Sequence, residues 1–157
     1  MSICVEKEQY LNVLESTGTL TFVPNGNSMW PFIKNRSQTV IIQKPSAPLK
    51  VYDVVFYLRP DGNYVLHRII ADQGDVYLVR GDSLLVTEQV PKSWIIGVMT
   101  GFYKGKTFVS ANDSKYLVEV EKWHKHSPCT KLKIKSFHFW QRVKNKLKRI
   151  FKVKETQ

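Results

Sequence analysis

The sequence predicts a mainly β fold: a curled, barrel-like antiparallel sheet, preceded by a short N-terminal helix and followed by a basic helical tail. Two observations carry this prediction. Short runs rich in Val, Ile, Tyr and Phe, separated by turn signals, recur over about 90 residues. Beyond them the periodicity becomes helical and lysine becomes frequent. The apolar fraction of 43% and the aromatic fraction of 12% are typical of a chain that folds around one modest core.

The first predicted element is an amphipathic helix over residues 6–16, ended by Gly18. A strand over residues 19–23 follows and leads into the turn Pro24-Asn25-Gly26-Asn27. The same β pattern predicts further strands over residues 39–43, 54–58, 64–70, 75–79, 95–100 and 107–110.

After Asn112 the apolar residues fall at helical spacing. The residues with this spacing are Ser136, Trp140, Val143, Leu147 and Ile150, joined by Phe139 and Phe151. We therefore expect one folded domain over residues 1–121, which contains all the predicted strands, and a basic, amphipathic helical tail over residues 122–157.

The net charge of +11 belongs to this tail. Residues 1–121 contain 12 Lys or Arg and 12 Asp or Glu, so they are neutral overall. Residues 122–157 contain the other 12 Lys or Arg and only one acid, Glu155. Such asymmetry predicts an anionic partner, either a membrane surface met by residues 131–154 or a nucleic acid. We favour the membrane, because no nucleic-acid-binding module is recognisable. A solvated helix docked on the domain is the alternative.

The sequence offers no cofactor site, no metal site and no membrane span. Its two cysteines, Cys4 and Cys129, lie outside any metal-binding spacing, and we expect free thiols in a reducing compartment. We find neither a secretory signal at the N-terminus nor an apolar run of about 20 residues. We therefore expect a protein of the cytoplasm or of the inner membrane face.

Three segments carry residues suited to chemistry: residues 26–31 (GNSMWP), 63–70 (NYVLHRII) and 80–83 (RGDS). Each alone is ordinary, since a serine in a turn, a histidine on a strand and an aspartate after glycine are usually structural. Together they supply a hydroxyl nucleophile, Ser28, and a base, His67, that is suited to neutral pH. Asp82 is a candidate to hold the imidazole in its working tautomer.

The order and wording of these segments resemble the signal peptidase I family of serine endopeptidases. The matching boxes lie within residues 20–101 and are Gly26-Asn27-Ser28-Met29-Trp30-Pro31, Asp53-Val54-Val55, His67-Arg68-Ile69 and Gly81-Asp82-Ser83. The resemblance implies Ser28 as nucleophile. His67 stands where most bacterial members have lysine, so the chain resembles the Ser-His form of the endoplasmic reticulum and archaea.

The same resemblance implies further roles. Asp82 matches an assisting aspartate, and Glu88 lies near a second one. Gly26, Asn27 and Met29 would border the oxyanion hole and the substrate, with Gly26 replacing a serine that donates to the oxyanion in many members. The substrate would be a signal or leader peptide with small residues, such as alanine, just before the scissile bond. The family's membrane anchor has no counterpart among these 157 residues.

Two alternatives remain open. The self-cleaving repressors share the fold but use a lysine base and a DNA-binding module that we do not find here. A catalytically silent binding module, attached to membrane or nucleic acid through the basic tail, would keep the fold without the chemistry.

Overall fold

The computed structural model describes the backbone of residues 2–125 and 128–154, and the side chains of residues 9–125 and 128–149. Contacts divide the chain into two compact units, residues 1–121 and residues 122–157. We describe each by itself. Within the described residues, no helix combines the length and the apolar character that crossing a bilayer requires.

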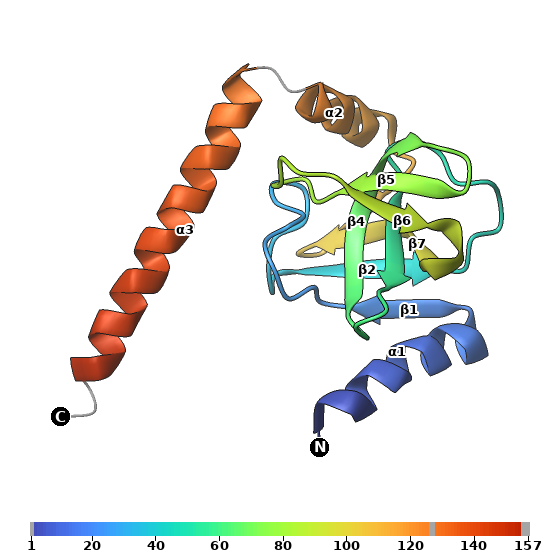
Figure 1. The fold of residues 1–157 in the computed structure, drawn as a ribbon, viewed down its shortest axis with the longest axis horizontal. Coiled ribbons are helices and arrows are strands. Elements are labelled where there is room, and N and C mark those ends of the chain that lie inside the picture. The colour runs from blue at the N-terminus through green and yellow to red at the C-terminus, as the bar shows by residue number, and fades with distance from the viewer. Residues whose placement is uncertain (1, 126–127, 155–157) are drawn as a thin grey trace. The chain divides into compact units, whose positions relative to one another are not determined.

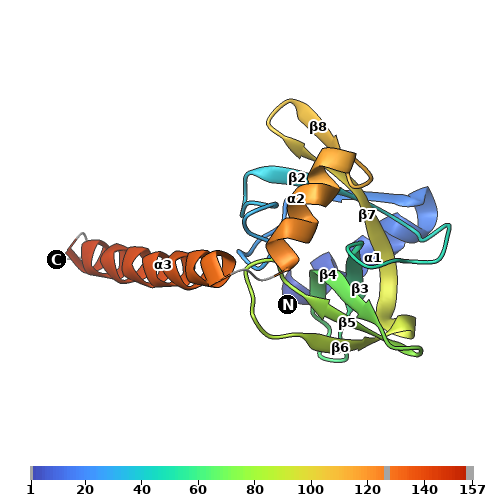
Figure 2. The same ribbon diagram turned by 90° about the horizontal axis from the view of Figure 1, so that it is seen from above.

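The first unit is an eight-stranded antiparallel sheet that curls but does not close (Figures 1 and 2). The predicted fold class is therefore confirmed. The strands follow the order β1-β2-β7-β3-β4-β5-β6, and β8 pairs with β7. Their bounds are β1 Thr19–Phe22, β2 Gln38–Gln43, β3 Val54–Leu58, β4 Tyr64–Asp72, β5 Val76–Arg80, β6 Glu88–Pro91, β7 Ile95–Lys104 and β8 Thr107–Ser110.

Helix α1, Ser2–Thr17, contacts β1 and lies beside it in both views (Figures 1 and 2). It begins four residues earlier than the expected helix over residues 6–16. Strand β6 was not predicted. It is a four-residue strand at the edge of the described sheet, where it pairs with β5. Its sequence, EQVP, is too short and too polar to show an alternating apolar pattern, and the terminal proline is typical of an edge strand.

The sheet buries a different core on each face, because successive side chains of a strand point to opposite sides. Along β3, Val54 and Phe56 join the first core, whereas Val55 and Tyr57 join the second. The first core includes Leu14, Leu20, Met29, Ile33, Val40, Ile42, Leu66, Met99 and Phe102. The second includes Ile69, Tyr77, Val79 and Val90. This alternation decides which face each functional side chain meets.

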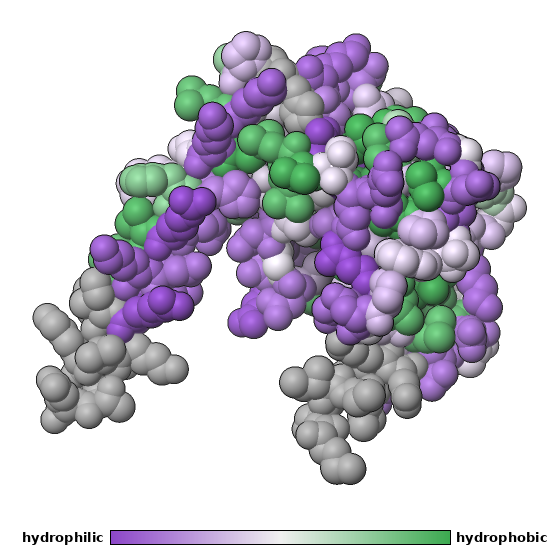
Figure 3. Space-filling view, in the orientation of Figure 1, coloured by the Kyte–Doolittle hydropathy of each residue, from purple (hydrophilic) through white to green (hydrophobic). Residues whose placement is uncertain are grey.

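The second unit is helical, as expected. It contains the end of α2, Ser114–His124, and all of α3, Pro128–Lys154. Within α3 the apolar side chains Leu132, Phe139, Trp140 and Leu147 are exposed, and the helix shows apolar and charged side chains together in Figure 3. Cys129 is a free, exposed thiol. The side chains of Cys4, Ile150 and Phe151 lie outside the described residues.

Candidate active site

The loop that carries Ser28 is fixed to the turn after β5 by two hydrogen bonds. Ser83 N–H donates to the Ser28 carbonyl at 2.8 Å, and the Ser83 hydroxyl donates to the Asn27 carbonyl at 2.8 Å. Ser83 is completely buried, so water does not compete for either bond. The backbone of the candidate nucleophile is therefore held by a residue 55 positions further along the chain.

Gly81 lets this loop approach the sheet. A Cβ atom on Gly81 would lie 2.7 Å from the Ser28 carbonyl oxygen and 2.9 Å from Ser28 Cβ. Arg80, at the end of β5, pairs with Arg68 of β4. The same register continued by one residue places Gly81 opposite His67, with both substituents on one face of the sheet. Ser28 therefore packs where the missing side chain of Gly81 would be, next to the strand position of His67.

His67 lies on the face of β4 that meets the second core. It pairs with Val55 and alternates with Val65 and Ile69, which both contact that core. Its exposed fraction is only 7%. Burial disfavours the imidazolium and lowers the pKa of His67 to about 4, although the nearby Glu88 carboxylate acts in the opposite direction. His67 is therefore neutral at pH 7, the state that a general base requires.

A polar network contacts one side of the imidazole. The Tyr57 hydroxyl lies 3.3 Å from His67 Nδ1 and donates to Glu88 Oε2 at 2.9 Å. Arg59 donates hydrogen bonds to both carboxylate oxygens of Glu88, and the one to Oε1 is 2.8 Å long. Hydrogen bonding to Arg59 is the main reason why the pKa of Glu88 is below its usual value. Burial, reinforced by Glu88, raises the pKa of the Tyr57 phenol, so this residue stays protonated.

These contacts assign the tautomer of His67. Glu88 is ionised and can only accept, so the single Tyr57 O–H hydrogen points to Glu88. The Tyr57 oxygen then accepts from His67, which places the ring hydrogen on Nδ1. The Nε2 lone pair is left on the side of the ring that faces away from Tyr57. On the β5 side of β4, the residue opposite His67 is Gly81, against which Ser28 packs.

Asp82, which we expected to hold the imidazole of His67, is paired with Arg68 in the structure. Both of its carboxylate oxygens accept from Arg68, at 2.7 and 2.8 Å, and both side chains are buried. Arg68 also donates to the Tyr116 hydroxyl and lies over the Phe32 and Tyr116 rings. Burial alone would lower the pKa of Arg68, but the Asp82 charge holds it above its ordinary value. Asp82 affects His67 electrostatically, less than Glu88 does.

The remaining predicted site residues, Gly26, Asn27 and Met29, belong to the loop that carries Ser28. Gly26 has a φ of +150°, which favours glycine, and its N–H donates to the Asn35 side chain at 3.1 Å. Asn27 contributes its carbonyl, which accepts from Ser83. Met29 is buried in the first core and also lines the pocket next to Ser28.

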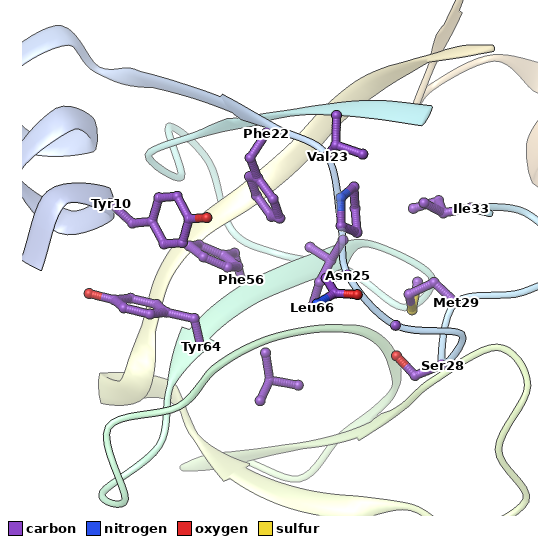
Figure 4. A pocket seen from close by; sticks show the side chains of 13 residues that line it. Tyr10, Phe22, Val23, Asn25, Ser28, Met29, Ile33, Phe56, Tyr64 and Leu66 are labelled. Carbon is purple, nitrogen blue, oxygen red and sulfur yellow. The ribbon is translucent and has the colours of Figure 1, made fainter. Parts of the chain in front are cut away.

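The Ser28 hydroxyl lies at one end of a pocket of about 380 Å³ (Figure 4). Within the described part of the chain, neither the hydroxyl nor the backbone N–H of Ser28 donates a hydrogen bond, to His67 or to any other residue. Catalytic hydrogen bonds are often long or absent before substrate binds. The Ser28 N–H is thus available to an oxyanion, and the hydroxyl is available to a base.

The sequence patterns did not single out Tyr57 and Arg59, and they related Glu88 only to a second assisting aspartate of the family. Tyr57 and Arg59 are two positions apart, so a strand over residues 54–58 extended by one residue would place them on one face. The position of Glu88 depends on the unpredicted strand β6, which pairs Glu88 with Val79.

The chain was compared with known proteins. No protein-family model matches the sequence, and no curated protein is similar to it at a significant level. Any function is therefore inferred from the residues and their geometry.

We predict that peptide cleavage stays level from about pH 8 to pH 5 and falls as the pH drops through about 4, the pKa of His67. Below this pKa the imidazole is protonated and accepts no proton. In Glu88→Gln the carboxylate that raises the pKa of His67 is gone, so the decline should move to lower pH. Turnover on the plateau should fall about 10- to 100-fold as the tautomer is less well held, part of the ~10²–10⁴-fold that a positioned base contributes.

Measurement of kcat/KM from pH 3.5 to 8 tests both statements. Glu15→Gln, which removes an exposed carboxylate of α1, is the matched control and should leave the profile unchanged. A midpoint near pH 6.5, the ordinary pKa of histidine, would contradict the buried base. An unshifted profile in Glu88→Gln would contradict the role of the network.

We predict that Asp82→Asn mainly destabilises the fold, by about 3–5 kcal/mol, since it leaves the buried Arg68 guanidinium without its counter-ion. Urea unfolding measures this loss. The same substitution at Asp72, whose pair with Lys92 is exposed, should cost at most about 1 kcal/mol. If Asp82→Asn unfolds like wild type yet abolishes turnover, Asp82 belongs to the chemistry instead.

Proposed function

We propose that this protein is a serine endopeptidase of the signal-peptidase kind, with Ser28 as nucleophile and His67 as general base. The observation that carries the proposal is the packing of Ser28 against Gly81, beside a neutral histidine whose Nε2 lone pair is left for a proton. A hydroxyl needs such a base, since its own acidity is too low at neutral pH.

The reaction would run as an acyl transfer. His67 Nε2 takes the Ser28 proton as the oxygen attacks the scissile carbonyl carbon, and the ring then gives that proton to the leaving amine. The Ser28 N–H is one donor for the oxyanion, which is where preorganised donors contribute most. A water molecule, deprotonated by the same nitrogen, hydrolyses the acyl-enzyme. Glu88, through Tyr57, is a positioning residue that stabilises the imidazolium formed in both steps.

Asp82 would support this chemistry from a distance. Its pair with Arg68 fixes the turn whose next residue, Ser83, holds the Ser28 loop. The silent binding module remains the competing function, and loss of the nucleophile separates the two.

Ser28→Ala should abolish cleavage of a leader-type peptide, at least about 10³-fold, because the attacking oxygen is lost. Its melting temperature should stay close to that of wild type, since the Ser28 hydroxyl makes no hydrogen bond among the described residues. Wild type, but not the variant, should be labelled by a fluorophosphonate probe. Ser83→Ala is the contrasting control: it removes a buried loop contact, so stability should fall as well. Undiminished turnover in Ser28→Ala would end the peptidase proposal.

A second proposal concerns the tail: α3 attaches the protein to an anionic membrane surface, as a peripheral protein. Residues 128–154 carry ten Lys or Arg and no Asp or Glu. Phe139 and Trp140 are 60% and 59% exposed, although large aromatic side chains are usually buried. Basic residues beside exposed aromatic ones fit the interface of an anionic leaflet, where each Lys or Arg contributes about 1 kcal/mol. Residues 1–121 are neutral overall and gain nothing from such a surface.

Full-length protein should co-sediment with vesicles containing anionic lipid and largely ignore neutral ones. Removal of residues 131–157 should abolish this binding and leave hydrolysis of a short soluble peptide nearly unchanged. Salt should weaken binding as the Debye length falls from about 10 Å at 0.1 M to about 3 Å at 1 M. The part that resists salt should decrease in a Phe139→Ser/Trp140→Ser variant. Equal binding to neutral and anionic vesicles would contradict the electrostatic account.

A further inference from the structure

The pocket that begins at Ser28 ends in a cluster of aromatic rings. Tyr10, Phe22, Phe56 and Tyr64 form this aromatic end, with neighbouring ring centroids 5.2–6.2 Å apart. Four elements build it: α1 supplies Tyr10, β1 supplies Phe22, β3 supplies Phe56 and β4 supplies Tyr64. Figure 4 shows Ser28 at one end of the pocket and the Tyr10 and Tyr64 rings at the other.

The aromatic end is open to a ligand and is not simply core. Phe56 is buried, but Tyr10, Phe22 and Tyr64 are only partly buried, and all four line the pocket. The wall between Ser28 and these rings is mostly apolar, formed by Val65, Leu66, Met29, Ile33 and Val23, and the Asn25 amide is its polar side chain (Figure 4). Such a surface gains most from a large apolar side chain, since aromatic rings pair favourably with one another and with aliphatic groups.

The distance along β4 between Tyr64 and His67 determines which residue of a bound peptide reaches the aromatic end of the pocket. Tyr64 precedes His67 by three residues, about 10 Å along the strand. Its side chain lies on the opposite face, that of the first core, which Met29 next to Ser28 also joins. Within the described chain, β5 pairs with β4 only from Arg68 to Asp72, so the β4 segment from Tyr64 to Leu66 has β3 on one side alone. An extended peptide has the same rise as the strand. With its scissile carbonyl at Ser28, its side chain about three residues away lies at the rings.

We propose that this pocket, as part of the peptidase site proposed above, selects peptides with a large aromatic or aliphatic residue two to four positions from the scissile bond. The expected alanine-type substrate would leave the aromatic end unfilled. A pocket of about 380 Å³ exceeds what a methyl group needs, and apolar pockets discriminate by roughly 10- to 200-fold for a single methylene. The substrate class is therefore a leader or precursor peptide with a bulky apolar anchor near the cleavage point.

The test is a set of peptides in which a single Phe moves through an Ala, Gly and Lys background, with cleavage mapped by mass spectrometry. Wild type should cleave peptides with Phe two to four residues from the cut at least about 10-fold faster, as kcat/KM, than the peptide without Phe. Tyr64→Ala and Tyr10→Ala should each reduce this preference several-fold. Tyr103→Ala is the matched control, because Tyr103 is an exposed tyrosine of β7 that contacts the Phe108 ring at a tilted angle and lies outside this pocket.

Fluorophosphonate labelling of each variant separates this inference from the peptidase itself. The probe needs Ser28 and His67 but no peptide, and labelling of Tyr64→Ala or Tyr10→Ala also shows that the variant is folded. Labelling that depends on Ser28, without any preference for Phe, overturns the pocket proposal and leaves the peptidase standing. A preference that persists in both tyrosine variants also overturns it. Absence of both labelling and cleavage in wild type overturns the two together.

Discussion

The buried ion pair between Arg68 and Asp82 is the interaction on which the arrangement of the candidate site depends. Arg68 follows His67 on β4, and Asp82 stands between Gly81, against which Ser28 packs, and Ser83, which binds the Ser28 loop. The pair therefore joins the strand of the proposed base, His67, to the turn that holds the proposed nucleophile, Ser28. A buried pair is weak evidence for net stability, because both charges lose their hydration, but removal of one partner is costly. Its contribution is to fix one geometry for Ser28 and His67, which are 39 positions apart in the sequence.

The alternation of β4 keeps this pair apart from the chemistry. His67 points to the face of the second core, and Arg68 to the opposite face, where Phe32 and Tyr116 enclose it. An arginine beside the imidazole would repel the imidazolium that the proposed mechanism forms. On the opposite face, Arg68 positions the turn at Asp82 without contacting the imidazole of His67. The cation near His67 is instead Arg59, whose charge is balanced by Glu88.

The sequence was sufficient for what local patterns determine. Alternating apolar residues and turn pairs predicted most strands to within a few residues, and the charge count placed the basic segment at residue 122, where contacts also divide the chain. Contacts between side chains of different strands depend on the strand order, and local sequence patterns do not predict that order. Glu88 approaches His67 only because β6 pairs with β5, and β6 is too short and polar to show a strand pattern. Asp82 was expected beside His67 because a carboxylate near a histidine is the usual arrangement, yet the neighbouring Arg68 binds both of its oxygens.

The surroundings of position 67 also explain why a histidine suits this site and a lysine would not. Burial lowers the pKa of any cationic base at this position, and it lowers the pKa of His67 to about 4, so the histidine is neutral at pH 7. A lysine must lose more than three pKa units to be neutral, and the Glu88 carboxylate acts against that loss because it stabilises a nearby cation. Moreover, the Tyr57 oxygen accepts a hydrogen from Nδ1 while Nε2 stays free, so one rigid ring makes the two contacts through two separate atoms. The Tyr57–Glu88–Arg59 network is thus matched to an imidazole, and the choice between the two bases is determined by residues outside the motif that carries the base.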